Sequence, residues 1–186
     1  TIFFEFHGTE TGAKEQAETV QAISEEFGGS AFQWTSKMED RNKLWQARHD
    51  AYYAAIALRS GCQGWATDVC VPVSRLAECI NETKDDLEET GLISPLVGHV
   101  GDGNFHMLYI VDPNNQEEMA KAQAHSDRMV MRALEMGGTC TGEHGVGYGK
   151  IHFLTNEHGD AMSLMRSLKT AFDPDNIMNP GKIVNI

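Results

Sequence analysis

Two histidines, His99 and His106, flank the dipeptide Asp102-Gly103 in the segment Val-Gly-His-Val-Gly-Asp-Gly-Asn-Phe-His at positions 97–106. An Asp-Gly pair between apolar runs favours a two-residue hairpin turn, because a type I′ turn requires positive φ at both central positions. Such a hairpin would place His99 directly opposite His106, with both imidazoles on one face and close enough to share a metal ion. A three-residue loop would place them on opposite faces. The alternative is two polar residues on a half-exposed hairpin.

A glycine-dense loop at 138–149 supplies a carboxylate, Glu143, followed directly by a third imidazole, His144. In an extended strand these two side chains would point apart. The glycines on either side permit a bent backbone that could aim both into one cavity. Two histidines and one glutamate are a typical ligand set for a catalytic metal that keeps one coordination position open. The pattern therefore predicts His99, His106 and Glu143 as metal ligands, with His144 free to move a proton.

Arg48 is a further candidate, because it lies within the apolar stripe of a helix predicted over residues 38–59, between Trp45 and Tyr52. A charge on an apolar helix face requires a partner. One candidate partner is a buried carboxylate, for which Asp68 is the candidate. The other is a substrate carboxylate, which a guanidinium can hold through two hydrogen bonds. The residues leave these two interpretations equally open.

The 186 residues are enough for one domain with a real core, and their 41 % hydrophobic and 23 % charged content is ordinary for a globular protein. The net charge of −12 argues against nucleic acid and anionic membrane surfaces as partners. No apolar run approaches the ~20 residues of a membrane span. The chain begins inside the apolar run Ile2-Phe3-Phe4 without a signal or transit peptide. We therefore expect a piece of a longer protein.

The four cysteines show no CxxC pairing. They indicate reduced thiols rather than a disulfide framework or a cysteine-type zinc site. They are Cys62, Cys70, Cys79 and Cys140.

Hydrophobic periodicity places the candidate residues on a succession of strands and helices. Strands are predicted over residues 1–7, 31–36, 65–73, 93–100 and 104–111. Helices are predicted over residues 11–27, 38–59, 75–90, 117–136 and 161–171, and residues 172–182 form a turn-rich tail that packs back on the body. This order predicts an α+β domain, a mixed but mostly antiparallel sheet with helices packed on one face.

Together these motifs resemble the C-terminal part of FAD-linked 2-hydroxy-acid dehydrogenases of the vanillyl-alcohol-oxidase type. The resemblance rests on the segments 98–106 and 142–147, on Phe-Asp-Pro at 172–174 and on Asn-Pro-Gly-Lys at 179–182, and it runs through nearly the whole chain. It implies that residues 1–186 form the C-terminal cap domain of a larger flavoprotein. The FAD would be bound mainly by an N-terminal domain absent from this chain.

The same resemblance implies roles for single residues, carried over by position. They are metal ligands at His99, His106 and Glu143, a catalytic base at His144, the substrate-binding arginine at Arg48 and a cofactor contact at Asn179. Zinc, manganese and iron(II) all accept two imidazoles and a carboxylate, and the resemblance favours zinc or manganese. It implies metal-assisted deprotonation of the substrate and hydride transfer to FAD.

Two departures from the family pattern bear on the substrate. Relatives that act on D-2-hydroxyglutarate carry a lysine where Ala66 stands and an asparagine where Leu108 stands, and both would meet the second carboxylate. A buried second carboxylate without a charge partner costs roughly several kcal/mol. The resemblance therefore implies oxidation of a D-2-hydroxy monocarboxylic acid, with D-lactate to pyruvate as the leading expectation. D-2-hydroxyglutarate and glycolate are the alternatives.

The resemblance also implies a mitochondrial location and an electron acceptor such as cytochrome c or an electron-transfer flavoprotein. A different class of function stays open, namely a metal-binding structural module without catalysis. A structural zinc site is usually closed by four protein ligands, whereas this sequence offers three obvious ligands and a spare histidine. We expect the chain alone to be inactive, because it contains no recognisable flavin-binding segment.

Overall fold

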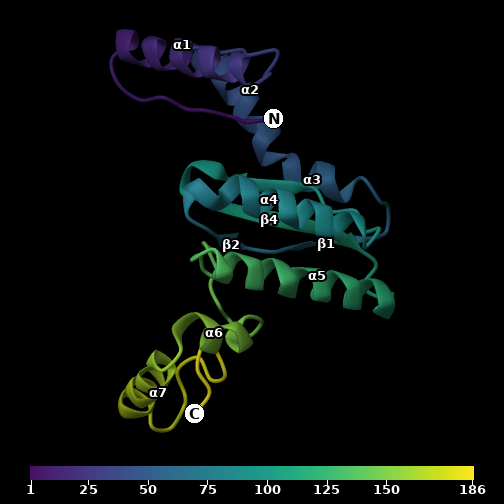
Figure 1. Cartoon of the computed structure of the whole chain (residues 1–186), viewed down its shortest axis with the longest axis vertical. Coiled ribbons are helices and arrows are strands. Elements are labelled where there is room, and N and C mark those ends of the chain that lie inside the picture. The colour runs from purple at the N-terminus through teal and green to yellow at the C-terminus, as the bar shows by residue number, and fades with distance from the viewer. The chain divides into compact units, whose positions relative to one another are not determined.

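The computed structural model describes all residues of the chain, 1–186, and divides it into two compact units, Thr1–Ala54 and Ala55–Ile186. The helices are α1 (Glu10–Glu26), α2 (Met38–His49), α3 (Ala51–Ile56), α4 (Val73–Glu88), α5 (Gln116–Glu135), α6 (Leu154–His158) and α7 (Ala161–Phe172). The strands are β1 (Gln63–Ala66), β2 (Val69–Cys70), β3 (Leu96–His99) and β4 (Asn104–Val111), and short 3-10 turns span Val100–Asp102 and Ile151–Phe153 (Figure 1). No helix is both long enough and apolar enough to cross a membrane.

The N-terminal unit is helical and has a small core. α1 begins after Thr9, whose hydroxyl oxygen accepts a hydrogen bond from the amide of Gly12, as expected of an N-cap threonine. The predicted helix over 38–59 is instead two helices, α2 and α3, which meet at Asp50. Aspartate is one of the weaker helix formers, and here its carboxylate accepts a hydrogen bond from the side chain of Gln46. The prediction of one continuous helix is therefore wrong.

The strands predicted over residues 1–7 and 31–36 are not formed. Neither segment makes a backbone hydrogen bond to another segment. An apolar run becomes a strand only where a partner strand satisfies its amides and carbonyls. The first segment is held to α2 by side chains instead, through stacking of Phe3 on Trp45.

The sheet of the C-terminal unit is built around β4. β1 and β2 pair with the two ends of β4, and β3 pairs with Asn104 to Met107, all antiparallel. β2 and β3 both pair with Asn104 and Phe105, so they lie on opposite edges of β4. The strand predicted over 65–73 is therefore interrupted between β1 and β2, at Thr67-Asp68. This interruption matters for the site, because both residues turn their polar groups inward there.

Every residue of β4 is buried, and its alternating side chains serve two faces. Phe105, Met107 and Tyr109 join side chains of α4 and α5 in the main core. Leu108 and Ile110 point to the other face, where they pack with α3 and the turn that follows it. The α4 and α5 helices run along the sheet in Figure 1. The predicted α+β class with a mostly antiparallel sheet is confirmed, but the helices do not lie on one face only, because residues 55–56 at the end of α3 pack on the face opposite α4 and α5.

Candidate metal and catalytic site

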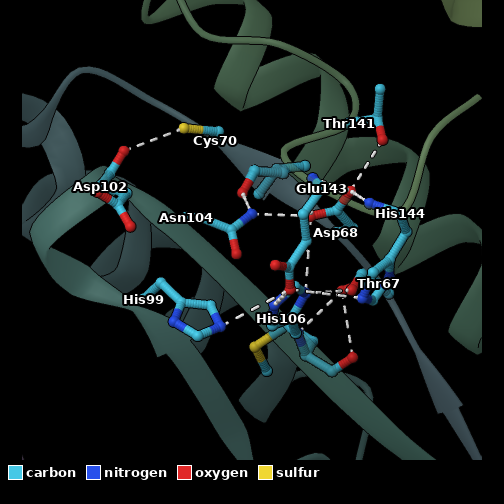
Figure 2. A network of polar contacts seen from close by, with 12 residues as sticks. Thr67, Asp68, Cys70, His99, Asp102, Asn104, His106, Thr141, Glu143 and His144 are labelled. Carbon is cyan, nitrogen blue, oxygen red and sulfur yellow. Dashed lines mark hydrogen bonds and ion pairs between the residues drawn. The ribbon is translucent and has the colours of Figure 1, made fainter.

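The three predicted metal ligands come together on the face of β4 opposite the α4–α5 core. The Nε2 atom of His106 lies 2.9 Å from the Oε1 atom of Glu143, and the Nε2 atom of His99 lies 3.8 Å from the same oxygen (Figure 2). One ligand atom from each of the three side chains lies within 4.8 Å of the other two. This is the spacing at which two imidazoles and a carboxylate can hold one metal ion.

The hairpin that carries the two histidines differs from the predicted one in its register. The chain turns through the 3-10 segment Val100–Asp102 and through Gly103, whose φ of +80° is the left-handed value that glycine adopts readily. As a result His99 pairs with Asn104, whereas His106 pairs with Val97. The direct His99–His106 pairing is therefore wrong by two residues. A shift of two preserves the face, because side chains alternate with a period of two.

The ring of His106 is fixed by the interruption between β1 and β2. Its Nδ1 atom lies 2.8 Å from the main-chain oxygen of Thr67, and the residue is 5 % exposed. A carbonyl oxygen can only accept a hydrogen bond, so Nδ1 carries the hydrogen. The Nε2 lone pair is then available on the side where Glu143 lies. Metal-ligating histidines are commonly oriented by such a bond to a backbone carbonyl.

Asp68 holds the loop that supplies Glu143 and His144. Its carboxylate accepts hydrogen bonds from the amides of both residues at 3.0 Å and from the Oγ1 atom of Thr141 at 2.8 Å. Asn104 adds a bond from its Nδ2 atom at 2.8 Å. Burial raises the pKa of Asp68, but these hydrogen bonds outweigh burial and hold the pKa well below its usual range. The carboxylate is thus a charged anchor for a bent backbone.

At Gly142 this loop passes close to the side chain of Asn104 on β4. A Cβ atom at position 142 would lie 2.0 Å from Nδ2 of Asn104, so no larger residue fits there without moving the strand or the loop. The close approach brings Glu143 and His144 over the same face. The Oε1 atom of Glu143 lies 3.6 Å from the Nε2 atom of His144.

The ring of His144 stacks on that of His106, with the centroids 4.7 Å apart and the planes 9° from parallel. His144 also belongs to a second group that could hold a metal, with Asp68 and His106. That group would use Nδ1 of His106, which Thr67 already occupies, and the carboxylate of Asp68, which already accepts four donors. The arrangement therefore favours the first group, and the half-exposed His144 lies beside it.

The family is shown by comparison with known proteins. Residues 1–183 match the family described as FAD linked oxidases, C-terminal domain. The chain belongs to this family. The FAD-linked oxidase domain is 49 % identical over 187 residues to a protein of Danio rerio named probable D-lactate dehydrogenase, mitochondrial, an alignment that covers 100 % of this chain and 38 % of the relative.

Two further relatives match the domain at lower identity. Identity is 43 % over 185 residues to D-lactate dehydrogenase (cytochrome), mitochondrial, of Arabidopsis thaliana, covering 99 % of the domain and 33 % of that protein. Identity is 33 % over 167 residues to glycolate oxidase subunit GlcD of Bacillus subtilis, covering 89 % of the domain and 35 % of that protein. The chain therefore spans about a third of the length of the curated relatives it matches.

Of the other two predicted site residues of the FAD-linked oxidase domain, Asn179 lies outside the cluster and Arg48 belongs to the other compact unit. Arg48 is a half-buried residue of α2, in the N-terminal unit, and has no carboxylate partner there. Its alternative partner, Asp68, receives its own set of donors and a nearby ammonium from Lys150, 3.5 Å from Oδ2. Asn179 is exposed, in a turn with φ of +47°, and its side-chain oxygen faces Lys182.

The tail that carries Asn179 packs back on the C-terminal unit. The amide of Ile183 donates to the main-chain oxygen of Gly147 at 3.1 Å, and Val184 joins the main core. The buried carboxylate of Asp173 accepts the amides of Ile177 and Met178 at 2.9 Å. The prediction that the tail returns to the body is confirmed.

Sequence reasoning missed the polar residues that support the cluster. The predictions from the sequence include Asp68 only as a partner for Arg48 and no role for Thr67, Asn104 or Thr141. The available signal was the presence of Thr67-Asp68 inside an otherwise apolar strand, where a charge requires buried partners.

Proposed function

We propose that this FAD-linked oxidase domain supplies the substrate and metal site of an FAD-dependent D-2-hydroxy-acid dehydrogenase, with D-lactate as the substrate and pyruvate as the product. The observation that carries the proposal is the convergence of His99, His106 and Glu143 beside His144. The names of the relatives in Danio rerio and Arabidopsis thaliana support the choice of substrate.

The donor set fits a divalent metal. Two imidazoles and a carboxylate suit zinc or manganese, and the bond between His106 Nδ1 and Thr67 leaves the right nitrogen free. A site with three protein ligands keeps a position open, which favours catalysis over the closed four-ligand arrangement of a structural zinc. A bound metal would polarise the hydroxyl and carboxylate oxygens of the substrate, and FAD, held mainly by the rest of the protein, would accept the hydride.

His144 takes the proton of the substrate hydroxyl at Nε2. Imidazole is the side chain best suited to accept a proton near neutral pH. Stacking on the buried His106 ring fixes the orientation of His144, while its half-exposed side chain can return the proton to water. Glu143, 3.6 Å away, stabilises the positive charge that His144 acquires. We assign binding of the substrate carboxylate to Arg48, which can hold it through two hydrogen bonds.

One cross-strand pair limits the size and charge of the substrate tail. Ala66 lies directly opposite Leu108, and directly opposite residues share a face. Leu108 is two residues beyond His106 on β4, so all three lie on the face that carries the cluster. Two apolar side chains at this place provide neither a positive charge nor a hydrogen-bond donor for a second carboxylate. This favours D-lactate over D-2-hydroxyglutarate, and the glycolate oxidase name of the Bacillus subtilis relative keeps glycolate as the second candidate.

The remaining assignments concern the whole protein. We place the flavin in the part of the protein outside this chain, with Asn179 of the C-terminal tail as a contact. The relatives named as mitochondrial support a mitochondrial location. The word cytochrome in the Arabidopsis thaliana name supports cytochrome c as the electron acceptor, with an electron-transfer flavoprotein as the alternative.

The experiment is turnover by the full-length protein on four acids, with a dye as electron acceptor. We expect a higher kcat/KM on D-lactate than on L-lactate, glycolate or D-2-hydroxyglutarate. The Arg48→Lys variant keeps the charge but loses the two-pronged geometry, so its KM for D-lactate should rise. Preference for D-2-hydroxyglutarate would contradict the substrate assignment, and an unchanged KM would remove Arg48 from it.

A further inference from the structure

Asn104 leaves a buried acceptor without a partner at the edge of the metal-ligand cluster. The residue is 5 % exposed. Its Nδ2 atom donates to Oδ1 of Asp68 at 2.8 Å and to the main-chain oxygen of Val69 at 2.9 Å. Its Oδ1 atom is buried and has no hydrogen-bond partner. Buried polar atoms nearly always have partners, so this oxygen calls for a donor that the chain itself does not supply.

The orientation of the amide follows from its neighbours. The oxygen of Val69 is a carbonyl and can only accept, so the amide atom 2.9 Å from it must be the nitrogen. A flipped amide would set two oxygens against each other at Val69 and again at Asp68. The unpartnered atom is therefore the oxygen, and it is turned away from both acceptors.

The position of Asn104 brings that oxygen to the cluster. Asn104 pairs directly with His99 across the hairpin and precedes His106 by two residues on β4, so the three side chains share a face. In Figure 2 the amide oxygen lies on the side of His99 and the Glu143 carboxylate, away from Asp68. None of these neighbours donates to it.

We propose that Oδ1 of Asn104 accepts a hydrogen bond from an O–H group bound at the open position of the cluster. This inference rests on the proposed function. The O–H group is the α-hydroxyl of the 2-hydroxy acid or a water molecule in its place before the acid binds. A 2-oxo acid has no such hydrogen, so Asn104 distinguishes substrate from product. Rotation about the C–O bond of the substrate then turns the hydrogen from Asn104 to His144, which removes it.

The test is the affinity of the metal-loaded full-length protein for D-lactate and for pyruvate, with and without the Asn104→Leu substitution. One neutral hydrogen bond corresponds to about a 2- to 12-fold change in affinity. If the substrate hydroxyl is the donor, Asn104→Leu weakens D-lactate binding by this factor and leaves pyruvate binding unchanged. If water is the donor, metal affinity without any organic acid falls by a similar factor.

The matched control is Thr141→Val, which also removes one hydrogen bond to Asp68 but leaves the oxygen of Asn104 in place. It should not change the ratio of D-lactate to pyruvate affinity. If Asn104→Leu weakens the binding of D-lactate and of pyruvate equally, and metal affinity is unchanged, the proposal is overturned.

A crystal structure of the metal-loaded wild-type protein, with and without D-lactate, tests the same point without any variant. A water or hydroxyl oxygen within hydrogen-bond distance of Oδ1 supports the proposal. The absence of both from that distance overturns it. Failure of the wild-type protein to bind D-lactate would contradict the proposed function alone, because the water and metal-affinity measurements still test Asn104.

Discussion

The Nε2 atom of His106 lies 2.9 Å from the Oε1 atom of Glu143, although one residue belongs to the central strand and the other to a distant glycine-rich loop. Two separate supports create this contact. The main-chain oxygen of Thr67 orients the His106 ring, and the carboxylate of Asp68 holds the amides of Glu143 and His144. Both supports come from the interruption between β1 and β2. The geometry of the site therefore depends on a break in one edge strand.

The first prediction concerns the metal. His106→Ala should lower metal affinity at least about 100-fold, because changes even one shell outside the ligands cost 10- to 100-fold. His99→Ala should act in the same direction. Metal content after dialysis, measured by mass spectrometry, checks both. His152→Ala is the control, since His152 is exposed and its neighbours, Asp127 and Phe153, do not belong to the cluster. Full metal occupancy in His106→Ala would remove it from the ligand set.

The second prediction separates the base from the ligands. His144→Gln should lower turnover by about 10²- to 10⁴-fold, the usual contribution of a general base, while metal stays bound. His158→Gln serves as the control, because His158 lies in α6 outside the cluster. Steady-state rates and metal content are measured on the same samples. Turnover equal to wild type would exclude His144 from proton transfer.

The third prediction concerns Asp68 and acid. Despite burial, hydrogen bonds lower the folded-state pKa of Asp68 from the ordinary value of ~3.9. The stabilisation is therefore fully present above that value and is lost as pH falls towards the folded-state pKa. Asp68→Asn should lower the free energy of unfolding by about 1–3 kcal/mol at pH 7 and flatten its decline between pH ~5 and 3.

Urea unfolding at a series of pH values measures this effect. Asp175→Asn, at an exposed aspartate of the same unit, is the matched control and should leave the pH dependence close to that of wild type. A decline as steep in Asp68→Asn as in wild type would show that the carboxylate carries no such linkage.

The fourth prediction concerns substrate size. Ala66→Lys, alone and with Leu108→Asn, should raise kcat/KM for D-2-hydroxyglutarate relative to D-lactate by about 10-fold or more, because a charged hydrogen bond contributes about 1.5–3 kcal/mol. Ala66 is exposed, so the single substitution avoids burying a new charge. The apolar change Ala66→Leu should give no such gain. If the lysine variant keeps the wild-type ratio, this pair does not contact the substrate tail.

Local patterns predicted the parts of the fold that depend on local interactions. The buried strand β4 and the helices α4, α5 and α7 lie within two residues of their predicted bounds, because periodicity and helix-ending residues are local signals. The strands predicted over 1–7 and 31–36 do not form, because strand pairing requires a partner elsewhere in the chain, which local patterns do not reveal.

In the candidate site, too, residue types could be predicted from the sequence, whereas contacts between distant segments could not. The residue types of His99, His106 and Glu143 indicated a metal cluster, and the structure brings them together, although the hairpin register was wrong. Their face was right because the error was an even number of residues. The sequence indicates that Asp68 requires buried partners but cannot identify them, because its donors come from β4 and from a loop far along the chain.

The most direct measurement is D-lactate turnover by the full-length protein before chelation, after chelation and after metal is restored, with metal content determined at each stage. The proposed mechanism predicts that activity disappears with the metal, while FAD remains bound, and returns when zinc or manganese is added. Full activity in a sample shown to contain no metal would contradict the assignment of His99, His106 and Glu143 to a catalytic metal site.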